Sequence, residues 1–175
     1  MIVIRNWAVR SGVAAPFALA FQIAISGCAP VADPSAGLTT TDAVALIDRA
    51  SRSDLTPQAV ADAFALNTRA TDVQREMLEK DLVGRTVEWD LSVYEVAYSE
   101  GRFEVTSQVI PVADADAVPL LRVQALVRPQ NESDDGMLRA VRTDDVIRIR
   151  GIVQEIWIRT IVVIVPAVAI VSEPT

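Results

Sequence analysis

The C-terminal half of the chain alternates apolar and polar residues with a period of two, which is typical of β-strands with one buried face. The stretch TVEWDLSV at 86–93 has an apolar side chain at every second position and a polar one between. Four further stretches predict strands: 102–110, 120–128, 145–158 and 160–171. Five short strands, with room for one helix between Asn131 and Val141, predict a small β-barrel.

The region 41–83 repeats its apolar residues every three to four positions instead, which predicts three short amphipathic helices. Thr56 stands before a proline as an N-cap, and Thr71 and Gln74 have the spacing of a capping box. Gly84 marks the end of the third helix. Three apolar side chains of this helix are expected to face the core: Val73, Met77 and Leu78. The sequence therefore predicts an α+β fold, with short N-terminal helices followed by a five-stranded barrel.

The last predicted strand differs from the others because it is apolar at every position, Ile161–Val171. A second membrane anchor is one interpretation of this run. A helical span needs about 20 residues, however, and Pro166 would interrupt a helix. The pattern favours a buried closing strand with a kink at the proline.

The N-terminus has the three parts of a secretory signal peptide. The first ten residues carry two arginines and no acid, and a mostly apolar run follows up to Ile25. Two small residues, Ser26 and Gly27, then precede Cys28, the only cysteine of the chain. The pattern predicts a signal peptide over 1–27 that is cleaved between Gly27 and Cys28.

The sequence ISGC at 25–28 resembles the lipobox of bacterial lipoprotein signal peptides. The resemblance implies that Cys28 becomes the first residue of the mature chain and carries lipid on its sulfur. Two or more acyl chains anchor a protein stably, whereas a single chain binds only weakly. Ala29 follows the cysteine in place of the aspartate that retains enterobacterial lipoproteins at the inner membrane, which points to the outer membrane. The alternative is a buried structural cysteine.

Residues 28–40 are rich in Pro, Ala, Gly and Thr and have no apolar face, so they predict an extended lipidated tether. The predicted domain organisation is then a signal peptide (1–27), this tether, a helical segment (41–83) and the barrel (84–172).

The barrel region is similar to OB-fold domains of the bacterial tRNA-anticodon-binding-like group. The likeness rests on VGRTVEWDLSVYEV and DDVIRIRGIVQEI, with a glycine before the first strand (Gly84) and another inside the fourth (Gly151). A glycine within a strand permits the sharp bend that a small barrel needs. Members of the group that bind nucleic acid carry basic and aromatic residues on the binding face, whereas this chain has Glu88 and Asp90 there.

Composition excludes several kinds of chemistry. The chain has no histidine, its only lysine is Lys80, and its net charge of −7 becomes −9 when Arg5 and Arg10 leave with the signal peptide. The commonest general base and metal ligand are therefore missing, and the acidic surface opposes nucleic-acid binding. We expect a non-enzymatic protein with no cofactor and no metal site.

One predicted outward face combines Arg148, Arg150 and Tyr94, and it could bind an anionic glycan or a phosphate. The same face could include three more arginines: Arg122, Arg128 and Arg159. The alternative is that these arginines form cross-strand ion pairs with Glu88, Asp90 or Glu104.

Other candidate sites are weaker. The tryptophans Trp89 and Trp157 fall by parity on the apolar face and are expected in the core. The stretch NESDDG at 131–136 resembles the start of a calcium loop, but Arg142 stands where the bidentate acid belongs. Asp114 and Asp116 form a loop pair that could catch a divalent ion.

These observations predict a lipid-anchored cell-envelope protein, on the periplasmic side of the outer membrane, that binds another envelope protein or a polymer. One alternative is an accessory lipoprotein for a small anionic ligand, a glycan or a divalent ion. A remote alternative is an OB domain that binds nucleic acid. A pocket lined by Arg148, Arg150 and Tyr94 would favour a ligand, and a closed, filled barrel with an external apolar patch would favour a partner.

Overall fold

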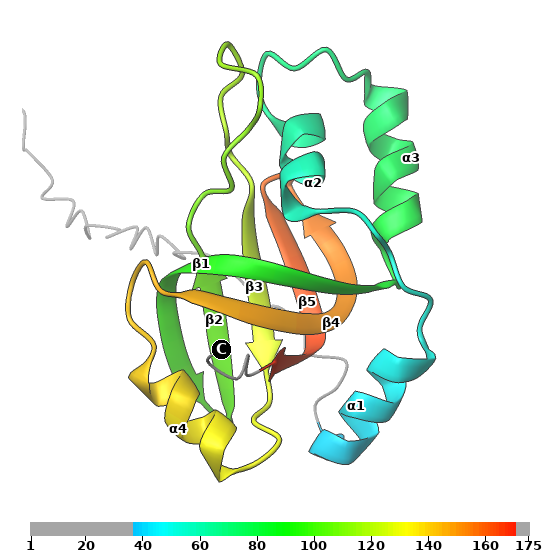
Figure 1. Cartoon of the computed structure of the whole chain (residues 1–175). Helices are drawn as coiled ribbons and strands as arrows, with labels where there is room; N and C mark the ends of the chain where they lie inside the picture. Colours follow the sequence, from blue (N-terminus) through cyan, green and yellow to red (C-terminus); the bar gives the residue numbers. More distant parts are fainter. Residues whose placement is uncertain (1–36, 171–175) are drawn as a thin grey trace, which may run out of the picture. The chain divides into compact units, whose positions relative to one another are not determined.

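The computed structural model describes residues 37–170, which fold as an α+β domain around a closed five-stranded barrel (Figure 1). The strands are β1 (Thr86–Ser99), β2 (Arg102–Ser107), β3 (Arg122–Val127), β4 (Val146–Trp157) and β5 (Ile161–Ile170). The helices are α1 (Thr40–Arg49), α2 (Pro57–Phe64), α3 (Asp72–Leu82) and α4 (Glu132–Ala140). The barrel closes in the order β1-β2-β3-β5-β4. The predicted fold class, a small OB-like barrel preceded by helices, is confirmed.

Strand β1 is longer than its alternating sequence predicted, because it pairs with a different strand along each half of its length. Its first part, Thr86–Ser92, pairs with β4, and its second part, Val93–Ser99, pairs with β2. The register with β2 shifts between Val93 and Glu95. A bulge of this kind bends a strand, so it lets β1 turn the corner of the barrel.

The β4–β5 ladder is irregular around a glycine and a proline. Its register shifts between Gly151 and Val153, opposite the part of β5 that contains Pro166. The parallel ladder between β3 and β5 also shifts beside this proline, between Ala125 and Val127. Proline has no N–H to donate, so it fits a strand only where a ladder is interrupted.

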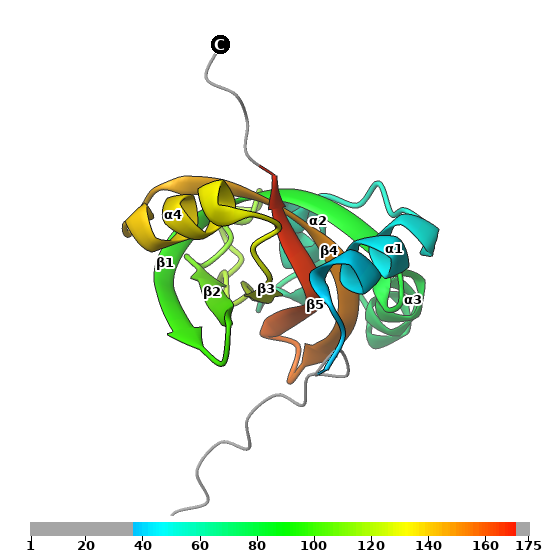
Figure 2. The same ribbon diagram turned by 90° about the horizontal axis from the view of Figure 1, so that it is seen from below.

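The interior of the barrel is filled by inward-facing side chains and closed by helices at both ends. Figures 1 and 2 show α2 at one end and α4 at the other. Val60, Ala61 and Phe64 of α2 are buried in the same core cluster as Leu138 of α4. The helix predicted between Asn131 and Val141 is therefore one of the two plugs.

Strand β5 is buried on both of its faces because α1 packs on its outer side. Ala43 and Ile47 of α1 are buried, and the Ile47 carbonyl accepts a hydrogen bond of 2.7 Å from the buried Thr86 hydroxyl. The uninterrupted apolar run of β5 is thus the closing strand that the sequence favoured. Between residues 37 and 170, no helix has both the length and the apolar character needed to cross a membrane.

The helix starts follow the predicted capping signals. Thr56 accepts the Ala59 N–H ahead of Pro57, and Thr71 and Gln74 form the full capping box. A second capping box, unpredicted, starts α1 at Thr39 with Asp42. Each box satisfies backbone N–H groups that have no partner inside the helix.

Candidate interaction surface at the β4–β5 turn

Arg148 and Arg150, predicted as a ligand face, each hold an acidic side chain. The Arg148 guanidinium donates two hydrogen bonds to Asp90 of the neighbouring strand, at 2.7 and 2.9 Å. This pair lowers the pKa of Asp90, because the hydrogen bonds favour the charged carboxylate. Arg150 binds Asp48 of α1 at 2.7 Å. The cross-strand ion pair considered from the sequence is thus what the structure shows for Arg148.

Tyr94 lies at the bend of β1, where the guanidinium of Arg122 is 4.8 Å from the centre of its ring. Arg128 donates a hydrogen bond to the Leu38 carbonyl at 3.1 Å. The arginines that could have joined one face therefore contact different parts of the protein, and a ligand face of Arg148, Arg150 and Tyr94 stays a prediction.

The expectation that Trp157 lies in the core is wrong, whereas Trp89 is buried as expected. The β4–β5 register shifts a second time between Val153 and Glu155. Beyond this shift the inward position is Ile156 rather than Trp157, and 39% of Trp157 is exposed. The parity rule fails because each extra residue in a strand turns the following side chains to the other face.

The turn after Trp157 exposes a second large apolar residue in a strained conformation. Ile158 is 70% exposed and has φ of 50°, and Arg159 has φ of 59°. The Thr160 N–H donates to the Trp157 carbonyl at 3.0 Å and closes the turn. Tight hairpin turns with two left-handed residues normally use Asn-Gly or Gly-Gly. A β-branched residue in this region is unusual, and such strain is concentrated at functional positions.

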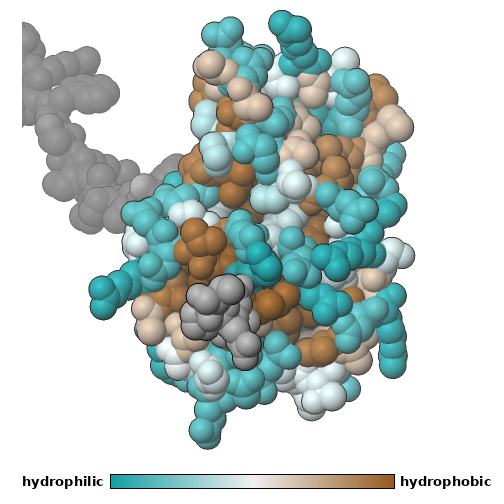
Figure 3. All heavy atoms as spheres, viewed as in Figure 1, coloured by the Kyte–Doolittle hydropathy of each residue, from teal (hydrophilic) through white to brown (hydrophobic). Residues whose placement is uncertain are grey.

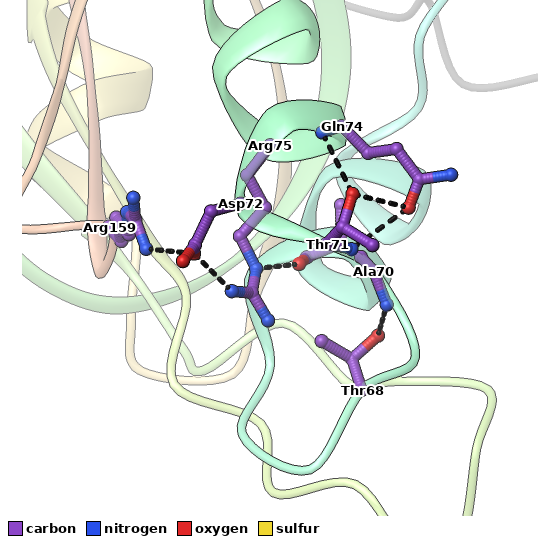
Figure 4. A network of polar contacts seen from close by, with 8 residues as sticks. Thr68, Ala70, Thr71, Asp72, Gln74, Arg75 and Arg159 are labelled. Atoms are coloured by element: carbon purple, nitrogen blue, oxygen red, sulfur yellow. Dashed lines mark hydrogen bonds and ion pairs between the residues drawn. The ribbon is translucent and has the colours of Figure 1, made fainter.

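Asp72, the first residue of α3, fastens this turn to the helix (Figure 4). Its carboxylate accepts hydrogen bonds of 2.9 Å from both Arg159 and Arg75. Arg75 also donates from Nε to the Ala63 carbonyl of α2 at 2.9 Å, so the network joins the turn, α3 and α2. The two guanidinium groups hold the pKa of Asp72 below its usual range.

The prediction that Val73 and Met77 face the core is wrong. They are 66% and 65% exposed, and Leu82 is the one residue of α3 that is buried. Leu78, the third side chain that was predicted to face the core, is partly buried against it. Helix α3 contacts the barrel mainly near its C-terminal end, at Leu82. The apolar side chains nearer its N-terminal end therefore face solvent.

Figure 3 shows hydrophobic residues at the surface over α2 and α3, interrupted by hydrophilic ones. We use the term turn surface for Trp157 and Ile158 together with the Asp72–Arg159 ion pair that positions them. Trp and Arg are enriched at the energetic centres of protein interfaces. The turn surface is therefore suited to contact a partner rather than to enclose a small molecule.

The acidic stretches do not assemble a cation site. Asn131 caps α4, and Asp134, three residues further on, is buried and accepts the Gln130 N–H at 3.0 Å. Asp114 accepts the backbone N–H of Asp116 at 3.0 Å. Throughout residues 37–170, no three metal-ligating side chains come together.

Cys28 and Gly27 lie outside the described residues, so lipidation of Cys28 and cleavage between the two residues stay predictions.

Fold and surface together define a small OB-like domain with a filled barrel and an exposed apolar turn. No family model and no curated protein matches the chain. Among solved structures it is similar to a crystal structure from Klebsiella pneumoniae subsp. pneumoniae MGH 78578, described as a "putative nucleic acid-binding lipoprotein". The TM-score is 0.39 and the identity 16%, over 54% of this chain and 77% of the other. A similarity of this size does not define a family.

Proposed function

We propose that the chain is a lipid-anchored, non-enzymatic interaction module of the bacterial cell envelope, which presents its turn surface to another envelope protein. The observation that carries the proposal is the exposure of Trp157 and Ile158 on a strained turn of a barrel whose interior is filled. A filled barrel leaves the outer surface as the place for recognition, and an exposed Trp–Ile pair supplies apolar area that a partner can bury.

The position of the proposed tether supports this orientation. Strand β3 starts beside the turn, because the Arg122 N–H donates to the Thr160 carbonyl at 2.8 Å. Just beyond its other end, the Pro129 carbonyl accepts a hydrogen bond from Thr40, at the start of α1. The lipidated tether would thus join the domain at the end opposite to the turn. Residue 37 stands nine positions after Cys28, so the chain between them can span at most about 30 Å.

The two alternatives have less support. A small anionic ligand or a glycan would need Arg148 and Arg150, and both arginines already bind carboxylates. Nucleic acid would have to overcome the repulsion of an acidic protein with net charge −7. The experiment that follows tests both alternatives as well.

The test compares three chains as bait in crosslinking capture from envelope extracts: wild type, Ile158→Ser and Val146→Ser. Val146 is the matched control, because it is 68% exposed and lies at the far end of the same strand. We expect a protein that wild type and Val146→Ser retain and that Ile158→Ser loses. The proposal would be overturned if all three baits retained the same proteins. It would also be overturned if oligonucleotide or glycan were the sole retained material.

The anchor is tested separately. We expect wild-type chain to incorporate labelled fatty acid and to fractionate with the outer membrane, and Cys28→Ser to lose the label. Label retained by Cys28→Ser would refute the lipid attachment, and recovery in the inner membrane would refute the proposed location.

A further inference from the structure

A shallow apolar groove runs along the side of α3, apart from the turn surface. It has a volume of about 580 Å³ and is lined by Leu55, Met77, Leu78, Lys80 and Asp81. Two further grooves, each of about 510 Å³, share residues with it. One shares Leu55 and extends over Glu88–Asp90 of β1, and the other shares Lys80 and extends to Val83. We call these three sections the α3 groove.

The floor of the α3 groove is apolar and held in place. Met77 is 65% exposed, and Leu55 and Leu78 are partly buried against the core. The Leu55 carbonyl accepts a hydrogen bond of 2.7 Å from the indole of Trp89, which fixes the chain before α2 over β1. Methionine is flexible and polarisable, and it is common on surfaces that accept apolar side chains of varied shape.

The rim of the α3 groove is acidic. Arg52 and Lys80 are its basic residues, and each is bound to a carboxylate, Arg52 to Glu88 at 3.1 Å and Lys80 to Glu76 at 2.8 Å. Asp81 and Asp90 are paired with arginines outside the groove. Asp54 and Glu79 remain without an ion pair in the described part of the chain, so the rim carries an excess of negative charge.

We infer that the α3 groove is a second docking surface, which binds a basic amphipathic helix of a partner protein. An amphipathic helix places apolar side chains in such a groove, and its lysines or arginines meet the rim. Complementary charge selects this class of partner and speeds its association, while the apolar floor supplies contact area. The surface of an anionic membrane would be repelled by Asp54 and Glu79. This inference goes beyond the proposed function and does not require the turn surface.

The probe is a synthetic amphipathic helix with leucine on one face and lysine on the other, labelled for fluorescence anisotropy. It is titrated with the full chain in uncharged detergent, and empty micelles serve as the blank. We expect binding that weakens about tenfold in Met77→Ala and severalfold in the double variant Asp54→Asn, Glu79→Gln. The affinity should also fall with added salt, and less steeply in the double variant.

The chain supplies matched controls for both substitutions. Val73→Ala removes an apolar side chain of equal exposure from the same helix, but Val73 does not line the groove. Glu95→Gln removes an exposed acid from β1. Both controls should bind as wild type does, and so should Ile158→Ser, which separates this test from the test of the turn surface. The inference would be overturned if the chain bound a glutamate version of the probe, a scrambled version or anionic vesicles as tightly as it binds the lysine probe. Unchanged binding of the lysine probe by Met77→Ala would overturn it as well.

Discussion

Gly151 and Pro166 approach each other so closely across the β4–β5 ladder that a Cβ atom on residue 151 would lie 2.6 Å from the Pro166 carbonyl oxygen. The same Cβ would lie 2.9 Å from the Ala167 Cα, so the backbone itself would have to move. We expect Gly151→Ala to lower the free energy of unfolding by about 2 kcal/mol or more. Urea denaturation followed by circular dichroism measures the loss.

Gly136 in α4 is the control for this prediction, because a Cβ there would have no neighbour within 4 Å. Alanine is a better helix former than glycine, so Gly136→Ala should raise the free energy of unfolding by about 1 kcal/mol. A Gly151→Ala variant as stable as wild type would contradict the close contact between β4 and β5.

The Trp89 indole is buried and donates to the Leu55 carbonyl. Phenylalanine would keep most of the apolar contact and leave this carbonyl without its donor, at a cost of about 1 to 2 kcal/mol. We therefore expect Trp89→Phe to reduce stability by this amount and to loosen the chain before α2. Faster hydrogen exchange in residues 52–58 than in wild type would confirm the second effect, whereas unchanged exchange would contradict it.

We expect Ile158 to lower the stability of the domain and to contribute to partner binding. Its left-handed backbone is costly for a β-branched residue and easy for glycine. We expect Ile158→Gly to raise the free energy of unfolding by about 1 kcal/mol and to weaken partner capture. Thermal unfolding and the capture experiment are run on the same preparations. A variant that is less stable than wild type would show that the turn is not strained.

The Asp72 network predicts a specific loss of stability in acid. Arg159 and Arg75 lower the pKa of Asp72 from its ordinary value of 3.8, so the carboxylate stabilises the fold at higher pH. This contribution is complete above about pH 3.8 and disappears as the pH falls through the lower pKa of the folded state. The difference in urea midpoint between about pH 6 and about pH 3 should be smaller in Asp72→Asn than in wild type. Arg159→Gln should reduce the difference as well, and a full difference in both variants would contradict the prediction.

The sequence predicted the features that depend on neighbouring residues. Thr56 before Pro57, and Thr71 three positions before Gln74, are complete local signals, so the starts of α2 and α3 were predictable. Four strands followed from their alternation, because a half-buried strand needs one apolar side chain in every two. Strand β5, buried on both faces, followed from its uninterrupted apolar run instead.

The features that sequence reasoning missed depend on contacts between distant parts. Trp157 is exposed because β4 has one extra residue relative to β5 between Val153 and Glu155, and no local pattern announces this irregularity. Met77 has the spacing of a core residue, but periodicity does not say whether another part of the protein packs on that face of the helix. Arg150 binds Asp48, which is 102 positions away, so only the packing of α1 on the barrel reveals the pair.

Helix α1 is both the cover of β5 and the first element after residue 37. A pull exerted on residue 37 would reach α1 before any strand, and it would detach the helix from β5, on which it packs. The ladders of the barrel would carry little of that load until α1 had detached. For a pull in this direction the mechanical weak point of the domain is therefore this helix, whose removal would uncover an apolar strand.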